Sequence, residues 1–474
     1  MSANSYTRVD TLIRKGTVVT EKGSFSGTIA IKNGLIVGIL SPDTFIEADE
    51  VLDVPGCLVL PGLIDPHLHL FEPGAEAYRE GFYFGTQAAA SGGVTTIIEM
   101  PLSFPPVLDQ ESFNLKLKIA QSKVVVDFAL WGGLIPASLK NINELKELGC
   151  IGFKAFMTNV EEFYPITTDY HLIEAMKQVA EFDGLIAVHA ENDDIVAYYT
   201  KLLKDSGRLD SEVHSDSRPE FAELEAIKRA ILFAEHTNCR LHVCHLSTAS
   251  GAEAIRQAKQ RGVRVTTETC HHYLTFDRSE LSRRGNFAKC NPPLRDKENV
   301  EKLWQFVLKG NVDCISSDHG PYSDEDKQRD SGSIWDAPAG FGGIDVMLSL
   351  IYEEGVHKRG LSLEKLVALT STNTAKIFGL YPWKGSMLIG ADADIAILDP
   401  NKIWVYRGVD SLSQTKSVNT PFEGRKMKGK VIATIVRGQT VYREGKILVE
   451  PGIGKYIPNN YYGMDGAIKD KKAL

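Results

Sequence analysis

The middle of the chain alternates short apolar runs with helix-like segments. Eight runs are almost continuously apolar, and they lie at residues 58–70, 94–100, 124–130, 150–157, 185–190, 241–246, 263–269 and 312–318. Runs of this kind indicate parallel strands buried on both faces, and connections such as 220–236 and 250–261 have the spacing of helices. Right-handed crossovers of this type close most simply into a (β/α)8 barrel, so we predict an α/β fold of that architecture.

A doubly wound open sheet is the alternative to a barrel. No Gly-x-Gly-x-x-Gly follows an early strand, so the sequence lacks the dinucleotide site that often accompanies such a sheet. The barrel is therefore preferred.

Both ends of the chain have a different pattern, of short strands separated by turns. The N-terminal runs lie at 11–14, 16–19, 27–31 and 35–39, and the C-terminal ones at 394–398, 430–436 and 440–442. The turns between the N-terminal runs indicate antiparallel hairpins. We expect the two ends to form one small β-sandwich domain, with residues 1–60 and 388–474 flanking a barrel at 61–387.

Composition narrows the class of protein. The 474 residues are 43% hydrophobic and 24% charged, as in ordinary globular proteins, and the formal charge of −8 comes with no basic cluster, so we expect no nucleic-acid partner. The seven cysteines show no paired short spacing, which favours a reducing cytoplasm over a disulfide framework. The N-terminus shows no basic-then-apolar leader and no run reaches about 20 apolar residues, so we expect no membrane association.

Two histidines end the first apolar run. His67 and His69 are one residue apart, so in a strand their side chains share a face. Two imidazoles converging from a strand end suit a metal ion, although His-x-His alone is a weak signal.

Further polar residues end later strands. They are Lys154 in the fourth run, His189 at the end of the fifth, His245 at the end of the sixth and Asp318 at the end of the eighth. In a barrel all of them would face the C-terminal mouth. Each histidine alone would be an ordinary core residue and Asp318 alone a helix cap, but a lysine in a buried strand is rare unless it is paired or chemically altered.

Four other histidines are less informative. His242 and His319 are out of phase with the neighbouring candidate ligands, so we expect structural or supporting roles for them. His271 and His272 stay undecided.

Together these motifs resemble the amidohydrolase superfamily, and within it the cyclic amidohydrolases: allantoinase, hydantoinase/dihydropyrimidinase and dihydroorotase. The resemblance covers essentially the whole chain and rests on residues 61–69, 152–157, 188–192, 242–247, 268–274, 291–295 and 317–321. It implies a metal-dependent enzyme that opens the C–N bond of a ring amide through a hydroxide bridging two metal ions. The same fold also occurs in non-catalytic dihydropyrimidinase-related binding proteins, which lack many of the metal ligands. We expect a homodimer or homotetramer.

The resemblance assigns roles residue by residue. His67 and His69 would bind one metal with Asp318, and His189 and His245 would bind the second. Lys154 would be carbamylated and bridge both ions, most often zinc. Asp318 would also carry the proton to the leaving nitrogen. The substrate ring would be held by main-chain groups at Asn291 and Ala339.

The substrate is narrowed by departures from related patterns. Dihydroorotases have Arg and Asn where this chain has Phe71 and Leu102, and D-hydantoinases have Tyr where it has Asn159. Residues 131–134 and 152–157 resemble allantoinases, although Phe71 also departs from their usual Asn, and residues 99–106, 126–130 and 447–452 resemble L-hydantoinases. We therefore expect a five-membered cyclic ureide, either allantoin or a 5-substituted hydantoin, with Phe71 favouring apolar ring substituents. Dihydropyrimidinase and dihydroorotase activities are the alternatives.

Overall fold

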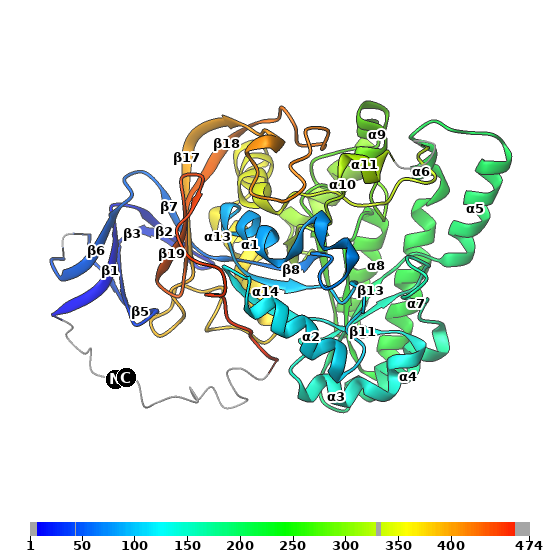
Figure 1. Ribbon diagram of the computed structural model, residues 1–474, viewed down its shortest axis with the longest axis horizontal. Helices are drawn as coiled ribbons and strands as arrows, with labels where there is room; N and C mark the ends of the chain where they lie inside the picture. Colours follow the sequence, from blue (N-terminus) through cyan, green and yellow to red (C-terminus); the bar gives the residue numbers. More distant parts are fainter. Residues whose placement is uncertain (1–6, 43, 329–332, 460–474) are drawn as a thin grey trace.

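The protein consists of a parallel β-barrel ringed by helices, with a smaller pair of β-sheets beside it (Figure 1). The structure is a computed structural model, and it describes residues 7–42, 44–328 and 333–459. The outermost parts of the predicted end segments, residues 1–6 and 460–474, lie outside the described residues.

The barrel strands follow one another in chain order around the ring. They are β8 (Leu63–Leu68), β9 (Val94–Glu99), β10 (Asp127–Leu130), β11 (Gly132–Leu134), β12 (Phe153–Phe156), β13 (Leu185–His189), β14 (Arg240–Val243), β15 (Val265–Cys270) and β16 (Cys314–Ser316). All neighbouring pairs are parallel. The ring closes where His69 N donates to His319 O at 2.7 Å, beside a parallel bridge between Leu68 and His319. The predicted barrel is therefore confirmed, and the open-sheet alternative is wrong.

Helices cover the outside of the barrel. Those longer than ten residues are α1 (Gly81–Ser91), α2 (Gln110–Gln121), α4 (Asp169–Ala180), α5 (Asp193–Asp205), α7 (Glu220–Thr237), α8 (Ala249–Gln260) and α10 (Lys297–Leu308). The shorter ones are α3 (Ile142–Glu147), α6 (Val213–Ser217), α9 (Ser279–Arg284), α11 (Asp324–Lys327), α12 (Met347–Ile351), α13 (Leu363–Val367) and α14 (Asn373–Ile377). In α7 the buried residues recur at helical spacing, so one apolar face packs on the barrel, and Asn238 ends the helix in the left-handed conformation.

The two chain ends build the smaller sheets together. One sheet has the order β5 (Leu35–Leu40), β4 (Thr28–Lys32), β1 (Arg8–Arg14), β6 (Glu47–Asp53). The other has the order β20 (Lys446–Ile447), β19 (Gln439–Arg443), β18 (Lys426–Val436), β17 (Ile395–Val405), β7 (Leu58–Pro61), β2 (Thr17–Thr20), β3 (Gly23–Ser26). Buried side chains from both sheets share one apolar core, which confirms the β-sandwich formed from both ends.

Two details of the sequence prediction are wrong. The N-terminal strands do not all pair antiparallel, because β1 pairs with β6, and β2 with β7, in parallel. The first apolar run is also two strands rather than one. It breaks at Gly62, where an added Cβ would lie 2.1 Å from Thr95 Oγ1, so that β7 joins the sandwich and β8 the barrel. The exact domain limits stay a prediction.

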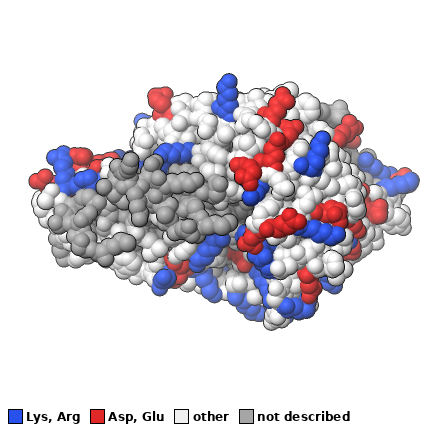
Figure 2. Space-filling model, turned by 90° about the horizontal axis from the view of Figure 1, so that it is seen from below, with Lys and Arg blue, Asp and Glu red and all other residues white. Residues whose placement is uncertain are grey.

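The surface carries mixed charge. On the described part of the face in Figure 2, lysine and arginine side chains are interspersed with aspartate and glutamate. Among the described residues, no helix is both long and apolar enough to cross a membrane. The expectation of no nucleic-acid partner stays a prediction.

Candidate active site

The six predicted ligand residues lie at the C-terminal ends of the barrel strands. His67 lies in β8, Lys154 in β12 and His189 at the end of β13, while His69, His245 and Asp318 lie within two residues after β8, β14 and β16. The ring centroid of His67 lies 5.4 Å from that of His69 and 5.1 Å from that of His245, and the His189 and His245 centroids are 4.5 Å apart. The fold therefore brings four imidazoles from three strands into one cluster.

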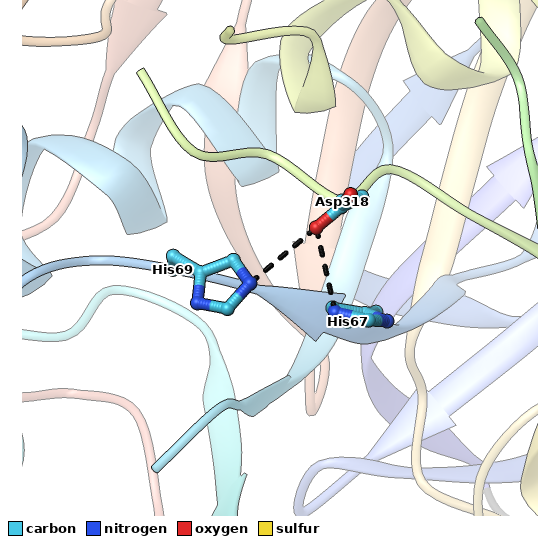
Figure 3. A group of neighbouring side chains, drawn as sticks. All are labelled: His67, His69 and Asp318. Atoms are coloured by element: carbon cyan, nitrogen blue, oxygen red, sulfur yellow. Dashed lines mark ion pairs between the residues drawn. The ribbon is translucent and has the colours of Figure 1, made fainter. Parts of the chain in front are cut away.

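Asp318 completes one side of this cluster (Figure 3). Its Oδ1 lies 3.4 Å from Nε2 of both His67 and His69, and the ligand atoms of all three residues lie within 4.8 Å of one another. Burial raises the pKa of Asp318, but the charges and hydrogen bonding of His67 and His69 outweigh burial and lower it to about 2. The carboxylate is thus ionised at neutral pH, able to bind a cation or accept a proton.

Lys154 lies beside the histidines and is fully buried. Its Nζ lies 5.0 Å from the centre of the Phe156 ring. Among the described residues, Nζ has neither a hydrogen-bond partner nor a carboxylate oxygen within 4.0 Å. A buried ammonium without compensation is very costly, which makes this side chain a candidate for chemical modification.

Burial lowers the pKa of three of the imidazoles. It brings that of His67 to about 4 and shifts those of His189 and His245 downward, and the Lys154 ammonium adds to the shift in all three. The rings are therefore neutral at pH 7, which is the form in which a histidine nitrogen binds metal.

Two buried glutamates orient the rings, and the sequence reasoning gave neither a role. Glu268 in β15 accepts from His67 Nδ1, and its other oxygen lies 3.3 Å from His242 Nε2. Glu191 accepts from His189 Nε2 at 2.8 Å. These contacts leave His67 Nε2 and His189 Nδ1 free for a ligand. A glutamate inside an apolar strand run was the signal that could have revealed Glu268.

The backbone turns sharply at three of the site residues. His245, Asp318 and Phe71 have φ values of 35°, 47° and 58°, in the left-handed region that non-glycine residues rarely adopt. Such conformations cost on the order of 1–2 kcal/mol each and are held by the surrounding structure. His245 and Asp318 each lie two residues beyond a strand end, and the turn there directs their side chains into the cluster.

A cavity of about 350 Å³ opens above the cluster. The three predicted substrate-binding residues, Phe71, Asn291 and Ala339, all line it, as do five of the six candidate ligands. Phe71 packs edge-on against Tyr322 with centroids 5.3 Å apart. Asn291 Oδ1 is buried with no hydrogen-bond partner, so this side chain as well as the main chain can meet a substrate.

The residues that distinguish the substrate alternatives also line this cavity. Leu102 contributes an apolar surface, and Asn159 is held by its N and Nδ2 donating to Asp193 at 2.8 and 2.7 Å. Arg218 is present but forms an ion pair with Glu191. Its charge is thus already compensated, and the wall formed by Phe71 and Leu102 is apolar.

The undecided histidines occupy different positions. His271 Nε2 contacts Gly343 O at 2.9 Å, and Gly343 N donates to His319 Nδ1 at 3.1 Å, so both rings hold the loop after the eighth strand. His272 lines the cavity near Asp318, and burial lowers its pKa to about 4. His242 is fixed by Glu268 and Thr266, as a supporting residue would be.

The donor set fits divalent metal ions. Two ligands about 2.0–2.1 Å from a tetrahedral ion are about 3.4 Å apart, which matches the separations of the two Nε2 atoms from Asp318 Oδ1. Neutral imidazoles with carboxylate partners are typical metal ligands. His189 and His245 offer further nitrogens in the same cluster, where the bare ammonium of Lys154 would repel any cation.

Comparisons with known proteins agree with this geometry. A sequence profile described as "Amidohydrolase family" matches residues 58–441. The chain is 41% identical over 451 residues to an allantoinase of Rubrobacter xylanophilus, covering 94% of this chain and 97% of that protein. It is 37% identical to an allantoinase of Bacillus licheniformis, covering 95% and 99%. The L-hydantoinase (dihydropyrimidinase) structure from Arthrobacter aurescens superposes with a TM-score of 0.92 at 35% identity, covering 95% of this chain and all of that one.

The profile spans the whole barrel and reaches into both end segments, and the relatives match along almost their full length. Sequence and structure comparisons thus agree with the resemblance drawn from the motifs. The chain belongs to the amidohydrolase family, and within it to the cyclic amidohydrolases, enzymes that hydrolyse the C–N bonds of cyclic amides.

Proposed function

We propose that this protein opens the ring of a five-membered cyclic ureide, with allantoin as the first candidate and a 5-substituted hydantoin as the second. The observation that carries the proposal is the cluster of four histidines and Asp318 around a buried, unpartnered lysine at the base of a 350 Å³ cavity. The similarity to allantoinases supports the first candidate, and the similarity to the L-hydantoinase structure supports the second.

Two zinc ions are the cofactors that the donor set suits best. His67, His69 and Asp318 would hold one ion and His189 and His245 the other, and a carbamate formed on Lys154 would supply anionic oxygen ligands. The carbamate replaces an ammonium by an anion, which removes both the burial cost of Lys154 and its repulsion of the metals. Bound there, the ions would polarise the ring carbonyl and lower the pKa of the attacking water.

The chain's own residues perform the remaining steps. Asp318, ionised next to His67 and His69, takes the proton of the attacking water on a carboxylate oxygen and delivers it to the ring nitrogen. That transfer is needed because an amide nitrogen leaves poorly as an anion. Main-chain groups at Asn291 and Ala339 hold the ring, and Phe71 packs against its substituent.

The apolar wall of the cavity sharpens the choice of substrate. Phe71 and Leu102 place no cation or amide where a substrate carboxylate would need one, which disfavours dihydroorotate. We also propose a cytoplasmic homodimer or homotetramer. Light scattering of the purified protein measures the oligomeric state, and fractionation of the source cells measures the location.

A turnover screen with metal analysis tests the proposed function. Purified protein is assayed with allantoin, 5-substituted hydantoins, dihydrouracil and dihydroorotate, and its zinc is counted. We expect about two ions per chain and the highest kcat/KM for allantoin or a hydantoin. Faster turnover of dihydroorotate than of any hydantoin contradicts the substrate class, and a metal-free, inactive protein supports a binding role instead.

A further inference from the structure

The loop of residues 333–340 forms one wall of the cavity and contains Ala339. A buried lysine from another part of the chain holds this loop. Lys289 Nζ donates to Ile334 O at 2.6 Å and to Ala337 O at 2.5 Å, and it also lies 3.5 Å from Trp335 O. One ammonium group thus contacts three main-chain carbonyl oxygens of the loop.

A second buried lysine holds the same loop from α11. Lys327 Nζ donates to Pro338 O at 2.9 Å and to Lys289 O at 3.4 Å. It also lies 5.3 Å from the centre of the Tyr322 ring, which packs against Phe71. All the hydrogen-bond acceptors that the structure gives for these two ammonium groups are main-chain carbonyl oxygens.

The main chain joins the two segments directly as well. Gly340 N donates to Lys289 O at 2.9 Å, one residue beyond Ala339. Lys289 lies two residues before Asn291. The two segments that are proposed to hold the substrate ring are therefore tied together at Lys289, and their relative position depends on it.

We propose that Lys289 and Lys327 are positioning residues, which set the distance between the main-chain groups at Asn291 and Ala339 and thereby the affinity for the cyclic substrate. The inference rests on the proposed function. Neither lysine is among the candidate metal ligands, so their contribution concerns substrate binding rather than the reacting atoms. Main-chain ring contacts need such support, since a displacement of about 1 Å is costly at an enzyme site.

Protonation of Lys289 offers a second readout. Burial lowers the pKa of Lys289 to about 8 and that of Lys327 to about 7. As the pH rises through 8, Lys289 loses a donor and the positive charge that strengthens its hydrogen bonds, so KM should rise. The charged and titratable groups around Lys289 are Arg218, Lys204, Lys327, Asp336 and His214.

The test compares Lys289→Met and Lys327→Met with a matched control, Lys118→Met, which changes an exposed lysine in α2. For Lys289→Met we expect KM to rise at least about tenfold, with kcat within about threefold and zinc content unchanged. Lys327→Met should show a smaller rise in KM. Lys289→Arg should bind substrate better than Lys289→Met and lose the rise of KM above pH 8, because arginine stays charged.

Hydrogen exchange separates this inference from the proposed function. In both methionine variants the amide of Gly340 should exchange faster than in wild type, whether or not the substrate is known. If wild-type protein hydrolyses no cyclic amide, the proposed function fails, and the exchange rates still decide whether the lysines hold the loop. KM values within about twofold of wild type in both methionine variants, or a loss of kcat together with zinc, overturn the inference.

Discussion

Two fully buried lysines lie at opposite ends of the same barrel, and their surroundings differ completely. Lys384 Nζ lies 2.8 Å from Asp127, 2.9 Å from Asp392 and 2.6 Å from Asp394. Asp127 begins β10, so this cluster is at the N-terminal end of the barrel, next to the sandwich. Lys154, near the C-terminal end, has histidines around it and no carboxylate within 4.0 Å among the described residues.

The difference separates a lysine whose charge is compensated within the fold from one that is a candidate for chemical modification. The Lys384 charge is compensated by three carboxylates, and Asp127 is also bound by Arg437 of the sandwich, so this ion cluster joins the two parts of the chain. The charge of Lys154 has no such compensation. A buried lysine of that kind is a candidate for chemical modification, and the proposed carbamylation would turn it into a metal ligand.

Replacing Lys154 should have the largest effect on activity. We expect Lys154→Ala to lose bound metal and to lower kcat/KM on the order of 10³-fold or more, because the variant cannot form the proposed carbamate. Metal analysis and turnover measure this. Short carboxylic acids should restore part of the activity. Wild-type protein stripped by a chelator is the control and should melt near the variant's temperature, since the site has lost its metal in both; a metal-replete variant contradicts the assignment.

Replacing Lys384 should affect stability instead. Lys384→Met leaves buried carboxylates without their cation, and we expect unfolding to become easier by about 3–5 kcal/mol. Denaturant titration measures the change, and Lys376→Met, at an exposed position in α14, is the matched control. The folded variant should keep its zinc. A stability equal to that of the control would mean that the ion cluster does not hold the sandwich to the barrel.

Replacing Asp318 should slow the chemical step. Asp318→Asn keeps the shape of the side chain but removes the carboxylate that we propose accepts the proton, and we expect kcat to fall on the order of 10²-fold or more. Steady-state kinetics at saturating zinc measure it. Turnover close to wild type would exclude the proton-transfer role.

Replacing Asn291 should have the smallest effect. If the main chain holds the ring, Asn291→Ala should change kcat/KM by no more than about threefold. Its side-chain oxygen is nevertheless buried and unpartnered, so the experiment separates two ways of binding. A complete loss of activity would assign the contact to the side chain.

The sequence predicted the barrel well because its strands are buried on both faces and read as continuous apolar runs. It predicted the position of Lys154 and of the histidines because strand ends share one mouth. It did not show where the first run divides, since that depends on the close approach of Gly62 to Thr95 in β9, a strand distant in the sequence. It also missed the parallel pairing of β1 with β6, because turn residues indicate a reversal of direction but not which strand becomes the neighbour.

Partners of buried charges were harder still to predict. Asp127 and Lys384 are 257 residues apart, and His67 and Glu268 are 201 residues apart. Periodicity indicates that such residues are buried but not which charge compensates which. The sequence singled out Lys154 because it interrupts an apolar strand run, but it gave no signal for Lys384. The three carboxylates that compensate Lys384 became visible only from its neighbours in space.

The carbamate on Lys154 is the central claim, and electron density at this side chain tests it most directly. Crystals of zinc-loaded, active protein grown with bicarbonate should show a planar group extending beyond Nζ, with one oxygen directed to each ion. The same density should be missing at Lys384, the buried lysine that is already compensated. A bare amine on Lys154 in a fully metallated, active enzyme would contradict the account.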